Sequence, residues 1–201
     1  MAGILIIAEH LNGAARDITK EAIGAARSIK NGIGGALVVA VVGNQTDAIA
    51  DSMNLPGVDE IVTVQTPGDH FDPHIYEECA LQLGQKYQPE LILFGHTVNG
   101  MACAAAVAAR IGAGFASDVC AIAVEGGSIV ATRGSYANRV NVELEFPGKP
   151  VVVLMLRAAT FKADRGDVAA AVTELEAVAA DSDLPQGLRD MAKLRAAPLL
   201  V

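Results

Sequence analysis

Short apolar segments alternate with amphipathic segments along roughly the first hundred residues of the chain. Four segments of strand length, rich in valine, isoleucine and leucine, span residues 4–8, 36–42, 60–64 and 91–94. Such runs are typical of strands that are buried on both faces of a parallel sheet. After the first segment, apolar residues recur at helical spacing, from Ile18 through Ala22 to Ile29. The pattern therefore predicts successive βα units.

Two of the predicted helices carry recognisable start signals. Asp72 followed by Pro73 is typical of an N-cap with proline at the first helical position. We expect the buried stripe of that helix to consist of Ile75, Cys79 and Leu83. Thr46 is a candidate cap for a short helix that reaches Met53. The helix that follows Gly100 is made mostly of small residues, which favours close packing on the sheet or on another chain.

The hydrophobic pattern changes after residue 112. Strand-like segments 119–125 and 128–133 flank a Gly-Gly pair, which is typical of a two-residue hairpin because both turn positions can take positive φ. In residues 140–146, valine, leucine and phenylalanine alternate with asparagine and glutamate. This strand has one wet face, and we expect it at an antiparallel edge.

A last apolar segment, residues 151–156, follows a Pro147-Gly148 turn and predicts a buried final strand. Together the segments predict an α/β fold of three layers, Rossmann-like, with a mostly parallel sheet, right-handed crossovers and an antiparallel hairpin at one edge. A length of 201 residues fits one large core.

Composition excludes several classes of protein. Hydrophobic residues make up 52% of the chain and charged residues 19%, which is incompatible with a disordered chain. The formal net charge is −8 and there is no basic run, so nucleic acid is excluded as a ligand. No apolar stretch approaches the ~20 residues of a membrane span. The three cysteines are widely spaced, which favours reduced thiols. We expect a soluble protein of the cytoplasm.

Candidate ligand-binding residues follow the predicted strands, because ligands of open α/β sheets bind outside the carboxyl ends of the strands. Glu9 follows the first strand, and a glycine-bearing segment follows the fourth and opens a helix whose free N–H groups could hold an anion. The candidates, which we name the crest, are Glu9, His96, Thr97, Asn99 and Gly100. The segment matches neither a dinucleotide-binding fingerprint nor a P-loop, so a plain helix cap competes with a nucleotide site.

No residue pattern predicts a metal site or a catalytic set. His70 and His74 are four residues apart, but Pro73 puts His70 before the helix and no third ligand is in view. The serines and cysteines have no nucleophile elbow and no recognisable histidine or aspartate partner. We therefore expect a protein that is not an enzyme.

The order of segments in residues 91–161 resembles the amino-terminal domain of the electron transfer flavoprotein alpha subunit. The pieces are the fourth strand with its Gly-His-Thr-Val-Asn-Gly turn, the alanine-rich helix ending at Gly112, the Ser117-Asp118-Val119 segment, the Arg133-Gly-Ser-Tyr136-Ala137-Asn138 segment, and the last strand closing at Phe161. The resemblance extends back to the first strand and covers about four fifths of the chain. It implies a sheet of the adenine nucleotide alpha hydrolase type.

The resemblance also implies a function, a cofactor and partners. Proteins of this family pass electrons from flavin dehydrogenases to an acceptor through bound FAD, and an alpha-type chain is the scaffold half of a heterodimer with a beta-type subunit. The family's principal FAD-binding domain has no counterpart after residue 161, so FAD is implied only in a complex or with that domain. On the isolated chain we expect no cofactor and a colourless protein, with AMP as a candidate ligand. A homodimer is the alternative assembly.

Two departures from the family pattern bear on the candidate sites. A lysine or arginine commonly follows the glycine of the fourth-strand turn in the family, whereas Met101 stands there in this chain. The loss of that cation weakens the case for a phosphate ligand. In the family, glycine and asparagine typically follow the Arg-x-x-Tyr-Ala segment, whereas Asn138 and Arg139 follow it in this chain. The family's segment lies towards the subunit junction, which makes Arg133, Tyr136 and Asn138 candidate interface residues; an ordinary loop is the alternative.

The chain is expected to divide into an alpha-type amino-terminal domain, residues 1–161, and a helical extension, residues 162–201, packed on the same domain. An amphipathic stripe runs from Val168 to Val178, and a second helix is predicted from Pro185. The apolar ending from Pro198 to Val201 favours a natural reduced relative over a truncated chain, and it needs a partner to cover it.

Two other functions compete with the electron carrier. The first is a stand-alone adenine-nucleotide-binding module of the same superfamily, comparable to universal stress proteins, although their G-x-x-G-x9-G-[ST] phosphate loop is missing here. The second is a small nucleotide hydrolase or ligase, for which the sequence offers no catalytic set.

Overall fold

The computed structural model describes residues 2–68, 70–163, 179–180, 185–187 and 190. The chain divides into two compact units, Met1–Asp164 and Arg165–Val201. The first unit contains all the strands and four helices of the described residues. The predicted helices beyond residue 164 lie almost entirely outside the described residues, so the expected packing of residues 162–201 stays a prediction.

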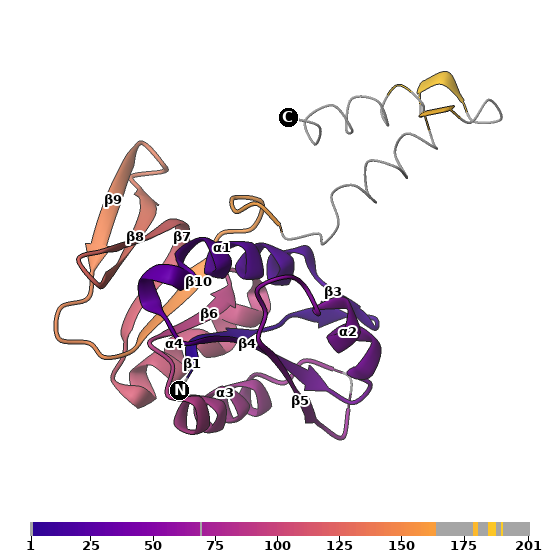
Figure 1. Ribbon diagram of the computed structural model, residues 1–201, viewed down its shortest axis with the longest axis horizontal. Coiled ribbons are helices and arrows are strands. Elements are labelled where there is room, and N and C mark those ends of the chain that lie inside the picture. The colour runs from indigo at the N-terminus through magenta and orange to yellow at the C-terminus, as the bar shows by residue number, and fades with distance from the viewer. Residues whose placement is uncertain (1, 69, 164–178, 181–184, 188–189, 191–201) are drawn as a thin grey trace. The chain divides into compact units, whose positions relative to one another are not determined.

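The strands and helices alternate as the hydrophobic pattern predicts (Figure 1). The strands are β1 (Ala2–Ile7), β2 (His10–Leu11), β3 (Ala14–Ala15), β4 (Ala36–Gly43), β5 (Glu60–Gln65), β6 (Leu91–Gly95), β7 (Gly114–Glu125), β8 (Ser128–Ser135), β9 (Val140–Glu145) and β10 (Val152–Leu156). The helices are α1 (Asp17–Ile33), α2 (Asp47–Ser52), α3 (Pro73–Tyr87) and α4 (Val98–Ile111).

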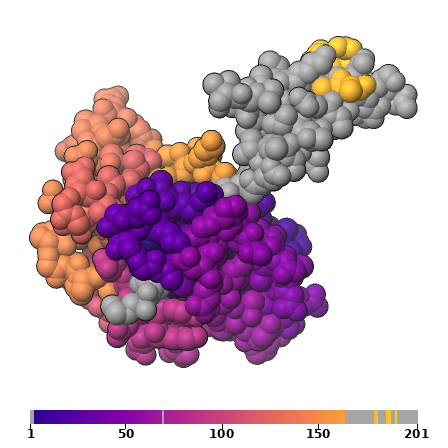
Figure 2. All heavy atoms as spheres, viewed as in Figure 1, coloured from indigo at the N-terminus to yellow at the C-terminus, as the bar shows by residue number. Residues whose placement is uncertain are grey.

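Eight strands form one sheet in the order β5-β4-β1-β6-β10-β7-β8-β9. The pairs from β5 to β7 are parallel, and β8 and β9 are antiparallel additions. The prediction of a mostly parallel sheet with an antiparallel edge is thus confirmed. In Figure 2 the hairpin strands form one margin of this unit, opposite the residues around α2 and β5.

The sheet separates two hydrophobic cores, which makes the three layers. Side chains of α1 and α2 pack on one face with Ile4, Ile6 and Val39, and side chains of α3 and α4 pack on the other face with Leu5 and Val38. Residues of β1, β4 and β6 therefore alternate between the two cores, as expected for strands covered on both faces. No helix of the described residues is long and apolar enough to cross a membrane.

Most of the predicted turn and cap chemistry is confirmed. Gly126 and Gly127 both have positive φ, at 57° and 83°, and join β7 to β8. The side chain of Asp72 accepts hydrogen bonds from the backbone N–H of His74 and Ile75, with Pro73 at the first helical position. Thr97 caps α4 by accepting a hydrogen bond from Gly100 N–H.

Two of the helix predictions were wrong, one of them in part. In the predicted buried stripe of α3, Leu83 is buried as expected, but Ile75 is exposed and Cys79 is half-buried. Tyr76 and Ala80 face the sheet instead, and Tyr76 is drawn inward because its hydroxyl donates a hydrogen bond to Val42 O at 2.8 Å.

The side chain of Thr46 makes no cap hydrogen bond to α2. It is buried, and its hydroxyl oxygen accepts a hydrogen bond from Gln65 Nε2 at 3.0 Å. Thr46 therefore ties the end of β5 to the start of α2 rather than capping the helix.

Candidate functional site

The crest lies where the strand order reverses. From β1 the chain adds β4 and β5 on one side, and then crosses to β6 on the other side of β1. The carboxyl ends of β1 and β6 therefore flank the topological switch point, which is the usual ligand position of open α/β sheets. Glu9 follows β1, while His96 and Thr97 follow β6.

The side chains of Glu9 and Thr97 lie together and form a hydrogen bond. The Thr97 hydroxyl donates to Glu9 Oε1 at 2.6 Å, and Arg16 Nη1 pairs with Glu9 Oε2 at 3.1 Å. The backbone of Glu9 is held as well, since its N–H donates to Thr19 Oγ1 and its carbonyl accepts from the same hydroxyl. We name Glu9 and Thr97 the closed pair.

Burial determines the electrostatics of the closed pair. Glu9 is 6% exposed, and this burial raises the pKa of its carboxyl group, while the hydrogen bond from Thr97 and the charge of Arg16 oppose the rise. A buried carboxylate beside the first turn of α4 repels an anion from that helix terminus. The geometry thus favours a helix cap over a phosphate site at these residues.

Two glycines, Gly95 and Gly100, allow the start of α4 to lie close to the end of β6 and to the Glu9 side chain. A Cβ atom on Gly100 would lie 2.0 Å from Gly95 O, and one on Gly95 would lie 2.7 Å from Glu9 Oε1 and from Ile18 Cγ1. Both positions leave no room for a side chain. Gly100, a candidate ligand residue by sequence, therefore has a packing role.

A second polar group occupies the other side of His96. Arg157 forms a bidentate ion pair with Asp118, with Nε–Oδ1 and Nη2–Oδ2 distances of 2.8 and 2.7 Å. His96 Nδ1 lies 3.2 Å from Asp118 Oδ1, and Arg157 Nη2 also donates to Asn138 Oδ1 at 2.9 Å. The Arg157 guanidinium lowers the pKa of the Asp118 carboxyl. We name Asp118, Arg157 and Asn138 the clamp.

Asp118 stands at a reversal of the chain. β7 pairs with β10 up to Val119 and with β8 from Val119 onwards, and Asp118 has a positive φ of 60°. The tip of the β7–β8 hairpin at Gly127 lines a cavity with Glu90, which directly precedes β6. The second half of β7 therefore returns to the amino-terminal edge of the sheet, and Asp118 lies at the carboxyl edge.

The clamp holds a strained loop. Tyr136, Ala137 and Asn138 are three consecutive residues with positive φ, between 52° and 61°. Non-glycine residues rarely adopt this conformation, and it persists only where the surroundings impose it. Arg157 fixes Asn138, and the loop leaves the Tyr136 side chain 82% exposed.

The three candidate interface residues are thus placed differently. Tyr136 is displayed to solvent, whereas the side-chain oxygen of Asn138 is taken by Arg157. Arg133 is half-buried, with Nη1 3.5 Å from Ser117 Oγ. Among the described residues, Arg133 Nε is the one buried side-chain nitrogen or oxygen atom without a hydrogen-bond partner.

Sequence reasoning missed the role of Asp118 and Arg157. In the sequence, Asp118 belongs only to a segment that carries the family resemblance, and Arg157 is not singled out. The two residues are 39 positions apart and meet because β10 lies beside β7. Arg157 directly follows β10, but Asp118 lies within β7, so no local signal paired them and the strand order was needed.

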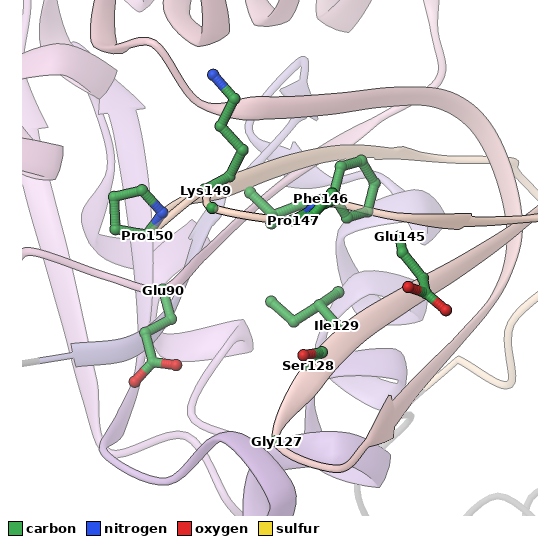
Figure 3. Close-up of a pocket in the computed structure, with 11 residues that line it drawn as sticks. Glu90, Gly127, Ser128, Ile129, Glu145, Phe146, Pro147, Lys149 and Pro150 are labelled. Carbon is green, nitrogen blue, oxygen red and sulfur yellow. The ribbon is translucent and has the colours of Figure 1, made fainter.

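The opposite edge of the sheet carries a cavity of about 460 Å³ (Figure 3). Figure 3 shows Glu90 and Glu145 on opposite sides of it, while the Lys149 side chain points away. Lys149 Nζ donates instead to Gly112 O at 2.9 Å. The polar groups do not converge, and the position at the amino ends of the strands is not the usual ligand position.

The described residues offer little for metal or thiol chemistry. They contain no group of three or more histidine, cysteine, aspartate or glutamate side chains that could hold a metal ion. Burial raises the pKa of Cys79, and it raises that of Cys103 to about 12. Both thiols are therefore held in the protonated form, which is a poor nucleophile.

Comparison with known proteins gives a consistent result. The sequence model of the family described as "Electron transfer flavoprotein domain" matches residues 4–183. The chain is 38% identical over 182 residues to the electron transfer flavoprotein subunit alpha of Methylophilus methylotrophus, covering 90% of this chain and 57% of that protein.

More distant relatives carry the same name. The subunit alpha of Bacillus subtilis is 26% identical over 82% of this chain and 50% of its own length, and that of Syntrophomonas wolfei is 28% identical over 76% and 47%. The chain thus spans about half the length of the curated relatives it matches.

Proposed function

The chain belongs to the electron transfer flavoprotein family, and from this premise we propose that it is an alpha-type scaffold domain in a flavin electron carrier between dehydrogenases and an acceptor. The observation that carries the proposal is the match to alpha subunits over nine tenths of the chain. It disfavours a stand-alone adenine-nucleotide-binding module. The closed pair and the clamp fit a scaffold, because their polar groups are bonded to one another rather than aimed at a substrate.

FAD does not fit the crest of this domain by itself. The cofactor carries a pyrophosphate, and the first turn of α4 offers it the buried carboxylate of Glu9 and the apolar side chains of Val98 and Met101. The cation of the clamp, Arg157, is already paired with Asp118, and Arg16 is paired with Glu9. We therefore assign FAD binding to the complex, where the flavin would supply the redox chemistry and this chain would supply support.

We propose a beta-type subunit as the partner, with a second copy of this chain as the alternative. Val98 is 78% exposed and Met101 54% exposed on α4, and Tyr136 is displayed by the strained loop. Tyrosine and methionine are enriched at protein interfaces. The proposed compartment is the cytoplasm, where reduced cysteines such as Cys79 and Cys103 persist.

Absorption spectra test the proposal. The chain would be purified alone and after co-expression with a beta-type subunit, and both samples would be measured between 350 and 500 nm, roughly the range of flavin absorbance. We expect no flavin absorbance for the chain alone and a copurifying partner in the second sample. Stoichiometric flavin on the isolated chain, or failure of the two chains to copurify, would contradict the assignment.

A further inference from the structure

The chain leaves the first compact unit through a short segment that follows β10. We name residues 157–161 the exit strap. The boundary between the two compact units lies only a few residues further on, after Asp164. Figure 1 shows the chain after β10 passing beside α1. The exit strap belongs to no helix or strand, so contacts with other elements determine whether it is fixed.

Glu21 of α1 holds the middle of the exit strap. Its side chain is 6% exposed, and its two oxygens accept hydrogen bonds from successive backbone N–H groups. Ala159 N–H donates to Oε1 at 3.1 Å, and Thr160 N–H donates to Oε2 at 3.3 Å. No lysine or arginine of the described residues forms an ion pair with Glu21. Because a buried carboxylate needs donors, the two N–H groups and Glu21 satisfy each other.

The backbone of the exit strap is shaped for this contact. Ala159 has a φ of 58°, a left-handed conformation that non-glycine residues rarely adopt. Successive N–H groups around such a residue form a concavity that suits an anion. The Thr160 hydroxyl donates to Ala158 O at 3.4 Å within the same turn. A strained turn persists only where its surroundings impose it, and the Glu21 carboxylate supplies that constraint.

Both ends of the exit strap are fixed as well. At its start, Arg157 N–H donates to Val119 O at 2.8 Å, and the Arg157 guanidinium is held in the clamp. At its end, Phe161 is half-buried and packs against the hydrophobic core on the α1 face of the sheet. The exit strap is therefore attached to the first unit at its start, its middle and its end.

The residues directly after the exit strap lack such contacts. Lys162 is exposed, and neither Lys162 nor Ala163 takes part in a hydrogen bond or an ion pair within the described part of the chain. The first backbone without an anchor thus follows Phe161, close to the boundary after Asp164.

We propose that the Glu21 carboxylate latches the exit strap and so confines the joint between the two compact units to the residues after Phe161. The latch is a conformational device of the fold, because it keeps residues 157–161 part of the first unit. Its loss would move the joint back to the end of β10, since the clamp holds only Arg157, the first residue of the strap. This inference does not depend on the electron-carrier proposal.

Hydrogen exchange of the backbone amides, followed by NMR on the full chain, tests the proposal. In the wild type we expect slow exchange at Ala159 and Thr160 and fast exchange at Lys162. Glu21→Gln replaces one acceptor oxygen by a donor, so it should speed exchange at the two strap amides about tenfold, which is 1.4 kcal/mol of opening free energy. Asp17→Asn is the matched control, because it makes the same change of charge at an exposed position of α1.

A second variant opens the latch from the strap. Ala159→Val leaves Glu21 in place, but a β-branched side chain opposes the left-handed conformation at this position. The position is exposed, so the larger side chain does not disturb the core. Exchange at the Thr160 amide should rise by a similar factor. If Glu21→Gln does not fold, Ala159→Val alone decides the outcome.

The proposal is overturned if the folded variants leave exchange at Ala159 and Thr160 unchanged, or if Lys162 exchanges as slowly as the strap amides in the wild type. A uniform rise over the amides of β1 and β6 would also overturn it, because that pattern marks a loss of global stability rather than release of the exit strap.

Discussion

The two sides of the carboxyl edge of the sheet differ in how their polar groups are used. On the β6 side, the closed pair and the clamp bond almost every polar atom to another protein atom. On the β1–β4 side, Gln45, Asn99 and His70 face a cavity without partners among the described residues. Similar residue types at one edge thus form contacts within the protein on the closed side, the β6 side, and remain without protein partners on the open side, the β1–β4 side. The difference predicts that substitutions on the closed side cost stability and that those on the open side do not.

The largest expected effect is at Gly100, on the closed side. Gly100→Ala should lower the free energy of unfolding by about 3 kcal/mol, because the new Cβ would lie 2.0 Å from a backbone oxygen that cannot rotate away. Gly84→Ala in α3 is the matched control. Its Cβ would meet only Ile92 Cδ1 at 3.8 Å, and the helix propensity of alanine should stabilise it by ~0.5–1 kcal/mol. Urea denaturation of both variants measures the contrast, and equal effects would contradict it.

The variants Thr97→Val and Gln45→Ala compare the stability cost of one substitution on each side. Thr97→Val removes a donor from a buried carboxylate and the cap of α4, so it should cost about 2 kcal/mol. Gln45→Ala removes an exposed amide without partners and should change stability by less than ~0.5 kcal/mol. Thermal denaturation followed by circular dichroism measures both. A costly Gln45→Ala would mean that the open side is also structural.

The clamp should give a smaller, pH-dependent effect. Asp118→Asn is expected to lower the melting temperature by a few degrees at neutral pH. Arg157 lowers the Asp118 pKa below its usual value of 3.8, so the stability from this carboxylate is present above pH 3.8 and is lost as the pH falls through the lowered value. The difference from the wild type should therefore disappear in acid. Asp51→Asn, at an exposed position, controls for the change of net charge.

Glu9 should show the opposite dependence on pH. Burial raises the Glu9 pKa above its usual value of 4.5, so its stabilising contribution is complete below pH 4.5 and is lost as the pH rises through the raised value. The uncharged variant Glu9→Gln keeps an acceptor for Thr97. Its stability relative to the wild type should rise as the pH increases from roughly 4 to 7, because the buried carboxyl of the wild type ionises over this range. A relative loss over that range would mean that the pair with Arg16 outweighs burial.

The sequence predicted the fold well because its signals are local. Apolar runs, the Gly126-Gly127 turn and the Asp72-Pro73 cap each depend on neighbouring residues, and the structure confirms them. The buried face of α3 was mispredicted because Tyr76 turns inward for a bond to Val42, 34 residues away. Bonds of this kind follow from tertiary structure rather than from local pattern.

The placement of the candidate residues follows in part from the ends of strands. Glu9 and Thr97 each follow a strand, and they meet across 88 positions of sequence. Whether their atoms would face each other or a ligand depended on the close approach at Gly95 and Gly100, which no spacing pattern reveals. The contact of His96 with Asp118 of the clamp depended on β10 lying between β6 and β7, which the sequence pattern does not show.

The most direct test of the scaffold assignment is the mass of the complex with a beta-type subunit, measured by light scattering after size-exclusion chromatography. We predict a one-to-one complex for the wild type and weaker association for Tyr136→Ala, because the strained loop displays this side chain for a partner. The cavity variant Gln45→Ala, on the open side, should assemble normally. A chain that remains monomeric or self-associates in the presence of the beta-type subunit would contradict the account.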